Sequence, residues 1–215
     1  MDLRVNQVAF GLGAGVLGAS PNRMGVWTQG CSLPKCRGCV STHTWSADGG
    51  RSLPVAALRR LAKAQTLPPA GLTVSGGEPT DQAGAVAILA AGFRSDFPDA
   101  ELVLYTGLRW RELVTRFPFL AVRFDVVVAG PYVRTREATP LAGSNNQEVR
   151  LLTPRAERLY ADWPSWPRHT LQVGQCQGDR LVTVGIPDTA RMAQAARQVG
   201  AVGVTWNQDD QRRRP

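Results

Sequence analysis

Three cysteines lie within nine residues of the chain, at Cys31, Cys36 and Cys39, in a C-x4-C-x2-C arrangement. Three thiolates on one short loop can bind a metal ion or an iron–sulfur cluster and leave one coordination position open. A further ligand can bind at that open position. The spacing therefore predicts a metal centre that takes part in chemistry.

Two kinds of metal centre fit these cysteines. Together with His43 they form a C-x4-C-x2-C-x3-H series, and three thiolates plus one imidazole make a tetrahedral zinc site. The alternative is a [4Fe-4S] cluster held by the three cysteines, with its fourth iron free for an exogenous ligand. Structural zinc sites serve small domains without a core, whereas 215 residues are enough to bury one. The iron–sulfur cluster is favoured, and zinc remains the alternative.

Three further segments stand where predicted strands end. They are Ser75-Gly76-Gly77-Glu78, Tyr105-Thr106-Gly107 and Ala129-Gly130-Pro131. Functional groups of parallel α/β sheets gather at such ends, so we expect these segments along one rim beside the cysteine loop. A glycine pair lets a ligand approach the backbone closely, and Glu78 could accept hydrogen bonds from an ammonium group.

The regular elements expected around these segments alternate between strand and helix. Strands are predicted at 3–10, 72–74, 102–105 and 124–129, and helices at 52–65, 81–94 and 110–117. This order is typical of a parallel sheet with right-handed crossovers. Residues 132–168 are interpreted as a long surface excursion, followed by strands at 169–175 and 180–186, a helix at 189–199 and a strand at 201–206.

Composition narrows the function classes. The net charge of +8 comes almost entirely from arginines, which are scattered and form no basic helix with interleaved aromatics, so a nucleic-acid partner is not favoured. No window is apolar enough for a membrane span, and no signal peptide is visible, which predicts a cytoplasmic protein. In that reducing compartment clustered cysteines are metal ligands rather than disulfide partners. The distant Cys176 is interpreted as a small residue at a strand end.

Several motifs occur in the order seen in radical S-adenosylmethionine (SAM) proteins. They are W-T-Q-G-C at 27–31, C-R-G-C at 36–39, S-G-G-E-P-T-D-Q at 75–82, Y-T-G at 105–107, D-V-V-V-A-G-P-Y at 125–132 and G-S-N-N-Q at 143–147. The chain most resembles the short, single-cluster branch that includes activating components of anaerobic ribonucleotide reductase. One departure is that the family's usual spacing is C-x3-C-x2-C, so we expect one extra residue, at Pro34-Lys35, to bulge from the loop.

This resemblance implies a fold and a site. The implied fold is an α/β partial (β/α) barrel with a mostly parallel sheet, formed by a radical SAM core at 1–150, with a small α+β extension at 151–215 packed on the same domain and a disordered tail at 207–215. Cys31, Cys36 and Cys39 would hold a [4Fe-4S] cluster, and SAM would chelate its unique iron. The residues implied to contact SAM are Ser75, Gly76, Gly77, Glu78, Tyr105, Thr106, Asp125, Ala129 and Asn146.

The resemblance also implies a reaction. Reductive cleavage of SAM would give a 5′-deoxyadenosyl radical, which would install a glycyl radical on a partner enzyme. A flavodoxin or ferredoxin would donate the electron. An alternative within the same chemistry is modification of a peptide or small molecule. The alternative from another class is a non-catalytic zinc or iron–sulfur binding module that contacts nucleic acid through its arginines.

Overall fold

The computed structural model describes residues 1–34, 36–168, 171–176, 181–186, 193–194 and 197. The expected tail at 207–215 and the expected strand at 201–206 lie outside the described residues, as does most of the expected helix at 189–199. For Cys176 the backbone is described and the side chain is not.

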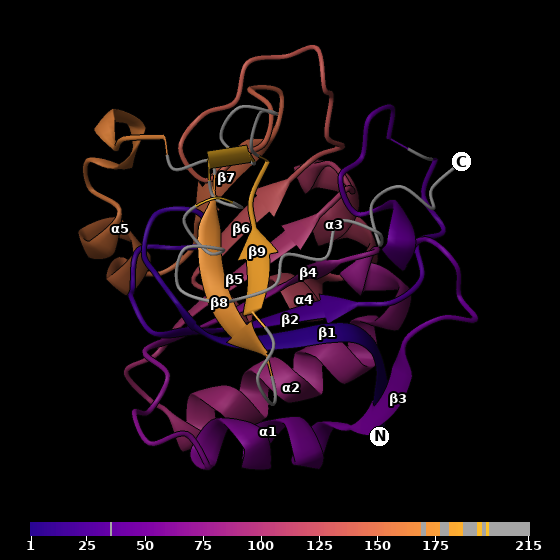
Figure 1. The fold of residues 1–215 in the computed structure, drawn as a ribbon, viewed down its shortest axis with the longest axis vertical. Helices are drawn as coiled ribbons and strands as arrows, with labels where there is room; N and C mark the ends of the chain where they lie inside the picture. Colours follow the sequence, from indigo (N-terminus) through magenta and orange to yellow (C-terminus); the bar gives the residue numbers. More distant parts are fainter. Residues whose placement is uncertain (35, 169–170, 177–180, 187–192, 195–196, 198–215) are drawn as a thin grey trace.

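The described strands form one nine-stranded sheet in the order β7-β6-β5-β4-β2-β1-β8-β9, with β3 beside β1 (Figure 1). The strands are β1 (Asp2–Leu12), β2 (Arg23–Thr28), β3 (Arg51–Pro54), β4 (Gly71–Gly76), β5 (Glu101–Thr106), β6 (Val126–Ala129), β7 (Glu148–Leu151), β8 (Gln172–Cys176) and β9 (Leu181–Val184). Because β8 pairs with β1, the described part of the C-terminal extension joins the same sheet.

The prediction of a mostly parallel sheet is wrong. Parallel pairing is confined to the centre, between β2 and β4, β4 and β5, and β5 and β6. All other pairings among the described strands are antiparallel. Parallel neighbours need a crossover, usually a helix, and the chain between the strands of each of these three pairs contains at least one helix. The architecture is a mixed α/β sheet with open ends at β7 and β9, so the partial barrel is not confirmed.

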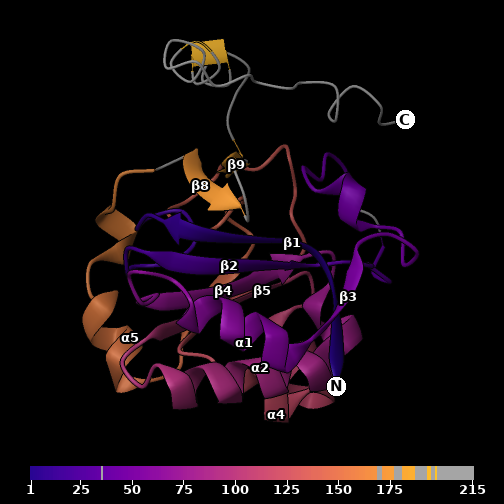
Figure 2. The same cartoon turned by 60° about the horizontal axis from the view of Figure 1, so that its bottom comes forward.

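Helices cover one face of the sheet. Figure 2 shows α1 (Val55–Lys63), α2 (Ala83–Asp96) and α4 (Pro118–Ala121) in a layer beneath the central strands. The remaining helices are α3 (Trp110–Arg116) and α5 (Pro154–Leu159), with 3-10 turns η1 (Thr42–Thr44), η2 (Pro79–Gln82) and η3 (Trp163–Ser165). Within the described parts of the chain, no helix combines the length and apolar character needed to cross a membrane.

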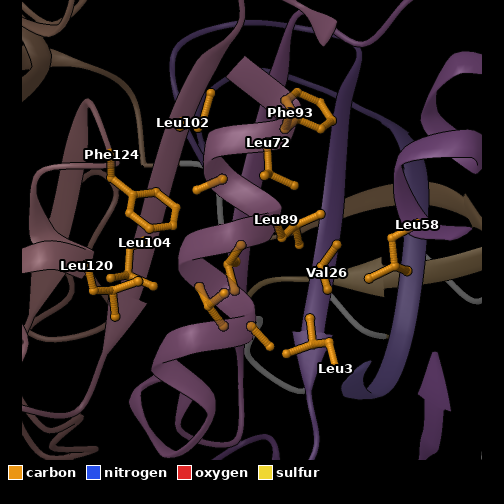
Figure 3. Close-up of a cluster of buried hydrophobic side chains, with 14 of the residues drawn as sticks. Leu3, Val26, Leu58, Leu72, Leu89, Phe93, Leu102, Leu104, Leu120 and Phe124 are labelled. Carbon is orange, nitrogen blue, oxygen red and sulfur yellow. The ribbon is translucent and has the colours of Figure 1, made fainter. Parts of the chain in front are cut away.

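The main core lies between this helical layer and the sheet (Figure 3). On α2, Val86, Leu89 and Phe93 recur at three- and four-residue spacing and are fully buried. They belong to the same cluster as the fully buried strand residues Leu72 and Leu102. Burying one such side chain contributes roughly 1.5–3 kcal/mol, so this stripe explains why a helix with few charged residues packs here.

The opposite face is held by a buried charge pair at the start of the strands. The guanidinium of Arg23 on β2 forms an ion pair with Glu101 on β5, and neither side chain has exposed surface. Tyr160 and the main-chain N–H of Ser20 also donate hydrogen bonds to Glu101. This network fixes the 13–22 loop and the end of α5 against the sheet.

Besides α4, which directly follows the helix predicted at 110–117, four strands and helices were not predicted. Two are β2 and β3, which lie next to glycine-rich segments and have no clear alternation. The other two, β7 and α5, lie in the segment that was interpreted as a surface excursion. The cysteine loop therefore follows the second strand, β2, rather than the first. Ser52 is part of β3, and α1 begins at Val55.

Candidate functional site

A cavity of about 130 Å³ opens at the carboxyl ends of β2, β4 and β5. Its walls come from the three cysteines and from two of the three strand-end segments expected along one rim, residues 75–78 and 105–107; Ala129-Gly130-Pro131 is not part of the lining. Leu33, Trp45 and Tyr132 complete the lining. The parallel pairing of β2, β4 and β5 brings their ends to one edge, which explains how segments distant in sequence meet.

The cysteine loop is anchored to the chain that follows it. The N–H of Gly30 donates to the carbonyl of Thr44 at 2.8 Å, and the N–H of Cys31 donates to the carbonyl of Trp45 at 3.2 Å. Within the loop, the N–H of Cys39 donates to the carbonyl of Cys36 at 3.1 Å. None of the three cysteines is in a disulfide, and all three are half-buried. They can therefore reach a shared centre and still leave it open to a further ligand.

The three cysteines fit the donor set of an iron–sulfur cluster. All three line one cavity, and His43, the fourth ligand of the alternative zinc site, is not part of its lining. Cysteine thiolates are the ligands that hold [4Fe-4S] clusters in proteins.

Burial matters for the thiol of Cys36. It raises the pKa of Cys36, and a hydrogen bond from the main-chain N–H of Tyr132 acts in the opposite direction. A buried thiolate is costly unless a positive centre binds it. Iron bound at the loop would supply that compensation.

The glycine pair packs closely against the start of the cysteine loop. A Cβ atom on Gly77 would lie 1.9 Å from the carbonyl oxygen of Gly30, and one on Gly76, at φ +115°, would lie 2.3 Å from the N atom of Thr28. The N–H of Glu78 donates to the carbonyl of Gly30 at 2.8 Å. Both glycines also line the cavity, so the expected approach of a ligand to their backbone stays a prediction.

Glu78 is a buried carboxylate whose partners are all uncharged. Its oxygens accept hydrogen bonds from the N–H (3.0 Å) and hydroxyl (2.8 Å) of Thr80, the hydroxyl of Thr106 (2.7 Å) and the N–H of Gly107 (2.8 Å). Burial raises its pKa. Among the described residues it forms no ion pair, although it lines the cavity. A cation that enters the cavity could therefore pair with the carboxylate of Glu78, which no cationic side chain among the described residues neutralises.

Three of the predicted contacts line the cavity and also form hydrogen bonds within the protein. The hydroxyl of Tyr105 donates to the carbonyls of Val16 (3.0 Å) and Leu141 (2.8 Å), while the residue lines the cavity. Burial raises the pKa of Tyr105, so the phenol stays neutral. The Thr106 hydroxyl is committed to Glu78. Ser75 lines the cavity, and its carbonyl accepts from the Thr28 hydroxyl at 3.2 Å.

Three predicted residues are not in the cavity lining. Asp125 precedes β6 and so lies at the amino end of the strand, where it binds Arg94 and accepts from the hydroxyl of Thr153 at 2.8 Å. This position does not fit the expected contact with ribose or adenine. Ala129 is buried in the main core. Asn146 donates to the carbonyl of Pro131 at 2.8 Å, and its buried Oδ1 has no hydrogen-bond partner among the described residues.

Sequence reasoning missed the segment that covers the cysteine loop. Tyr132 lines the cavity, and the side chain of Arg134 lies so close to Gly38 that a Cβ there would be 2.4 Å from its Cδ atom. Gly38 has φ +78°, a conformation that favours glycine. The G-P-Y motif contained a signal for Tyr132, but no local pattern identifies Arg134 because its neighbour is about a hundred residues away in the sequence.

Comparisons with known proteins agree with this site. Residues 13–150 match the family described as "4Fe-4S single cluster domain". The anaerobic ribonucleoside-triphosphate reductase-activating protein of Vibrio cholerae is 27% identical over 145 residues, which are 64% of this chain and 93% of that protein. The crystal structure of QueE from Escherichia coli is similar over 74% of this chain and 68% of its own, with a TM-score of 0.42 and 15% identity.

The resemblance to the single-cluster branch of the radical SAM proteins is thereby confirmed. The two expected cofactors, a [4Fe-4S] cluster and SAM, are confirmed at the level of the family. The family match covers more than half of the chain and includes all three cysteines. The chain belongs to the 4Fe-4S single cluster domain family.

Proposed function

We propose that this protein is a radical SAM activase, which uses a [4Fe-4S] cluster on Cys31, Cys36 and Cys39 to install a glycyl radical on a partner enzyme. The observation that carries the proposal is that three cysteine thiols and the buried Glu78, which has no ion-pair partner among the described residues, line one cavity. A centre with three protein ligands has room for an amino acid ligand at the fourth iron. SAM is such a ligand and carries an ammonium group.

The residues of the cavity would have distinct tasks. The carboxylate of Glu78 would attract the ammonium group of SAM, and the walls at Ser75 and Tyr105 would exclude water from the radical. When bound, the reduced cluster supplies one electron, which cleaves SAM into methionine and a 5′-deoxyadenosyl radical. That radical would take one hydrogen atom from a glycine Cα of the partner, giving 5′-deoxyadenosine and a glycyl radical.

The partners follow from the same proposal. The Vibrio cholerae relative is, by its name, the activator of an anaerobic ribonucleoside-triphosphate reductase, which supports a glycyl radical enzyme as the target here. A flavodoxin or ferredoxin would supply the electron. Cysteines outside disulfides fit a reducing compartment, so we propose that the protein works in the cytoplasm with residues 1–150 as its catalytic core.

Anaerobic reconstitution tests the first step. We expect about four irons per chain, the content of one [4Fe-4S] cluster. With dithionite and SAM, the loaded protein should release methionine and 5′-deoxyadenosine, detected by liquid chromatography. The matched control omits dithionite and should release neither. A fully loaded cluster that yields no 5′-deoxyadenosine would contradict the proposed enzyme class, and one zinc with no iron would contradict the cluster.

A substitution at Glu78 tests SAM binding separately. Glu78→Gln keeps the shape of the side chain but removes its charge, and it places an amide opposite the N–H of Gly107. We expect the cluster to load normally and the Kd for SAM to rise about tenfold, as for loss of one charge-assisted hydrogen bond. Isothermal titration calorimetry on the loaded variant measures this change. Glu112→Gln, on the exposed side of α3, is the control and should bind SAM as the parent does.

A further inference from the structure

A second and larger cavity lies at the opposite edge of the sheet. Its volume is about 490 Å³, and α2, the turn at 121–125 and α5 enclose it. Asp125, at the amino end of β6, lines this second cavity, which therefore lies at the amino ends of the strands. The cysteine cavity lies at their carboxyl ends. Ligand-binding cavities for small molecules measure roughly 300–1,000 Å³, so this one has the size of a binding site.

Arginines dominate the lining of this cavity. Arg94, Arg123, Arg155 and Arg158 face Asp125 as the one acidic residue of the lining. Asp99, outside the lining, lies 3.6 Å from Arg155, so two of the four arginines have no acidic partner among the described residues. The carboxylate of Asp125 is itself neutralised by Arg94, at 2.5 Å, and accepts from the N–H of Leu102 at 2.8 Å. It therefore repels an incoming anion only weakly.

The four arginines fall into two pairs. Arg94 and Arg155 are half-buried and both donate to the carbonyl of Ala100, so they are held in place by the fold. Arg123 and Arg158 are exposed at the rim, and among the described residues neither belongs to an ion pair. Fixed guanidinium groups at the base and free ones at the rim can surround an anion from two sides.

We propose that this cavity binds a phosphorylated small molecule of nucleotide size. Guanidinium groups form paired hydrogen bonds with phosphate oxygens, and four guanidinium groups around one cavity match a polyphosphate better than a single carboxylate. Apolar residues, Ala91, Pro98 and Val122 among them, form the rest of the wall and would contact the uncharged part of the ligand. This site does not depend on the cluster or on the proposed activase function.

Calorimetry on the full, cluster-loaded chain with saturating SAM tests the proposal. The probes are pyrophosphate and magnesium-free ATP, with citrate as an anion of similar charge that lacks phosphate. We expect one site per chain for both phosphates, weakened by added salt, with citrate at least about tenfold weaker. Absence of phosphate binding, or equal binding of citrate, would overturn the proposal. The same binding to Cys36→Ala, which we expect to lack the cluster, separates this result from the activase proposal.

A pair of double variants locates the site. Arg123→Gln combined with Arg158→Gln should weaken pyrophosphate and ATP binding by about tenfold or more, because two charge-assisted contacts are lost. The matched control, Arg60→Gln with Arg111→Gln, removes the same charge from exposed positions outside the cavity and should change the Kd less than about twofold. Both double variants alter exposed side chains, and circular dichroism checks their folding. Equal losses in the two double variants would assign the binding to overall charge and contradict the site.

Discussion

Buried carboxylates at the two edges of the sheet differ in whether an arginine neutralises them. At the amino ends of the strands, Glu101 is paired with Arg23 and Asp125 with Arg94. At the carboxyl ends, Glu78 is as deeply buried but receives hydrogen bonds from uncharged donors alone among the described residues. A carboxylate that the protein does not neutralise is poised to bind a cation, whereas a neutralised one stabilises the fold.

The two ends of a single strand can therefore serve different roles, one in stability and one in cofactor binding. β5 begins with Glu101 in a closed charge network and ends with Thr106 and Gly107, which serve Glu78 in the open cavity. The same strand thus contributes to both edges. Substitutions at the carboxyl edge should change cofactor binding first, and those at the amino edge should change the free energy of unfolding first.

The largest effect is expected at the carboxyl edge, for Cys36→Ala. Two thiolates cannot hold the cluster as three do, so reconstituted iron should fall from about four per chain to almost none. Iron and sulfide analysis of anaerobically reconstituted protein measures this. Cys176→Ala is the control and should keep its full iron content. Loss of iron from that variant instead would mean that the ligand set is wrong.

Next in size is Glu101→Ala at the amino edge. It leaves the guanidinium of Arg23 buried without its partner, which should lower the free energy of unfolding by about 3–5 kcal/mol. Urea denaturation measures the loss. A double variant, Arg23→Met with Glu101→Leu, should recover most of it, because an apolar pair leaves no buried charge. If the double variant were as unstable as the single one, the charge pair would not be the cause.

Gly77→Ala tests the contact between β4 and the cysteine loop. Its Cβ would collide with the carbonyl of Gly30, so we expect a loss of about 3 kcal/mol in the free energy of unfolding and weaker cluster retention. Gly84→Ala is the matched control, because its Cβ would be 3.9 Å from the nearest side-chain atom and it lies in α2. That substitution should stabilise the chain by about 0.5–1 kcal/mol. Equal effects in the two variants would contradict the assigned contact.

The smallest destabilisation is expected outside both edges, for Asp96→Asn on α2. Arg59 and Lys63 lower the pKa of Asp96 to about 2. Because both partners are partly exposed, we expect a loss of only about 1–2 kcal/mol. A lowered folded-state pKa stabilises the fold above the unfolded value of 3.8 and loses this effect as the pH falls towards 2.

Urea titrations at pH 7 and near pH 2 check this dependence on pH. Parent and variant should differ at the higher pH and converge at the lower one. Asp99→Asn is the control, because its fully exposed carboxylate lies 3.6 Å from Arg155 and should contribute little. A difference between parent and Asp96→Asn that does not change with pH would rule out the charge as its source.

The sequence was informative where a pattern reflects local physics. The continuous apolar run at 102–105 and the helical stripe around Leu89 predicted β5 and α2 to within a few residues. The cysteine spacing and the strand-end motifs predicted which segments meet at the cavity, because parallel strands end at one edge. These features depend on neighbours in sequence or on one general rule of topology.

The remaining features depend on contacts between distant segments. The antiparallel partners of β1 and β6 could not be predicted, since no local pattern says which strand pairs with which. The reason for the glycine pair is also non-local, because Gly77 is required by the carbonyl of Gly30, far away in the sequence. Asp125 was grouped with SAM contacts because of its motif, whereas the strand direction places it at the other edge.

The hydrogen bonds between the start of the cysteine loop and the end of β4 bear on how the protein matures. Gly77 and Glu78 donate to the carbonyls of Thr28 and Gly30, so these backbone bonds are made by the polypeptide alone. The residue directly before the ligand Cys31 is therefore held by the edge of the sheet. Loading of the cluster and folding of β4 should for this reason be coupled, each stabilising the other.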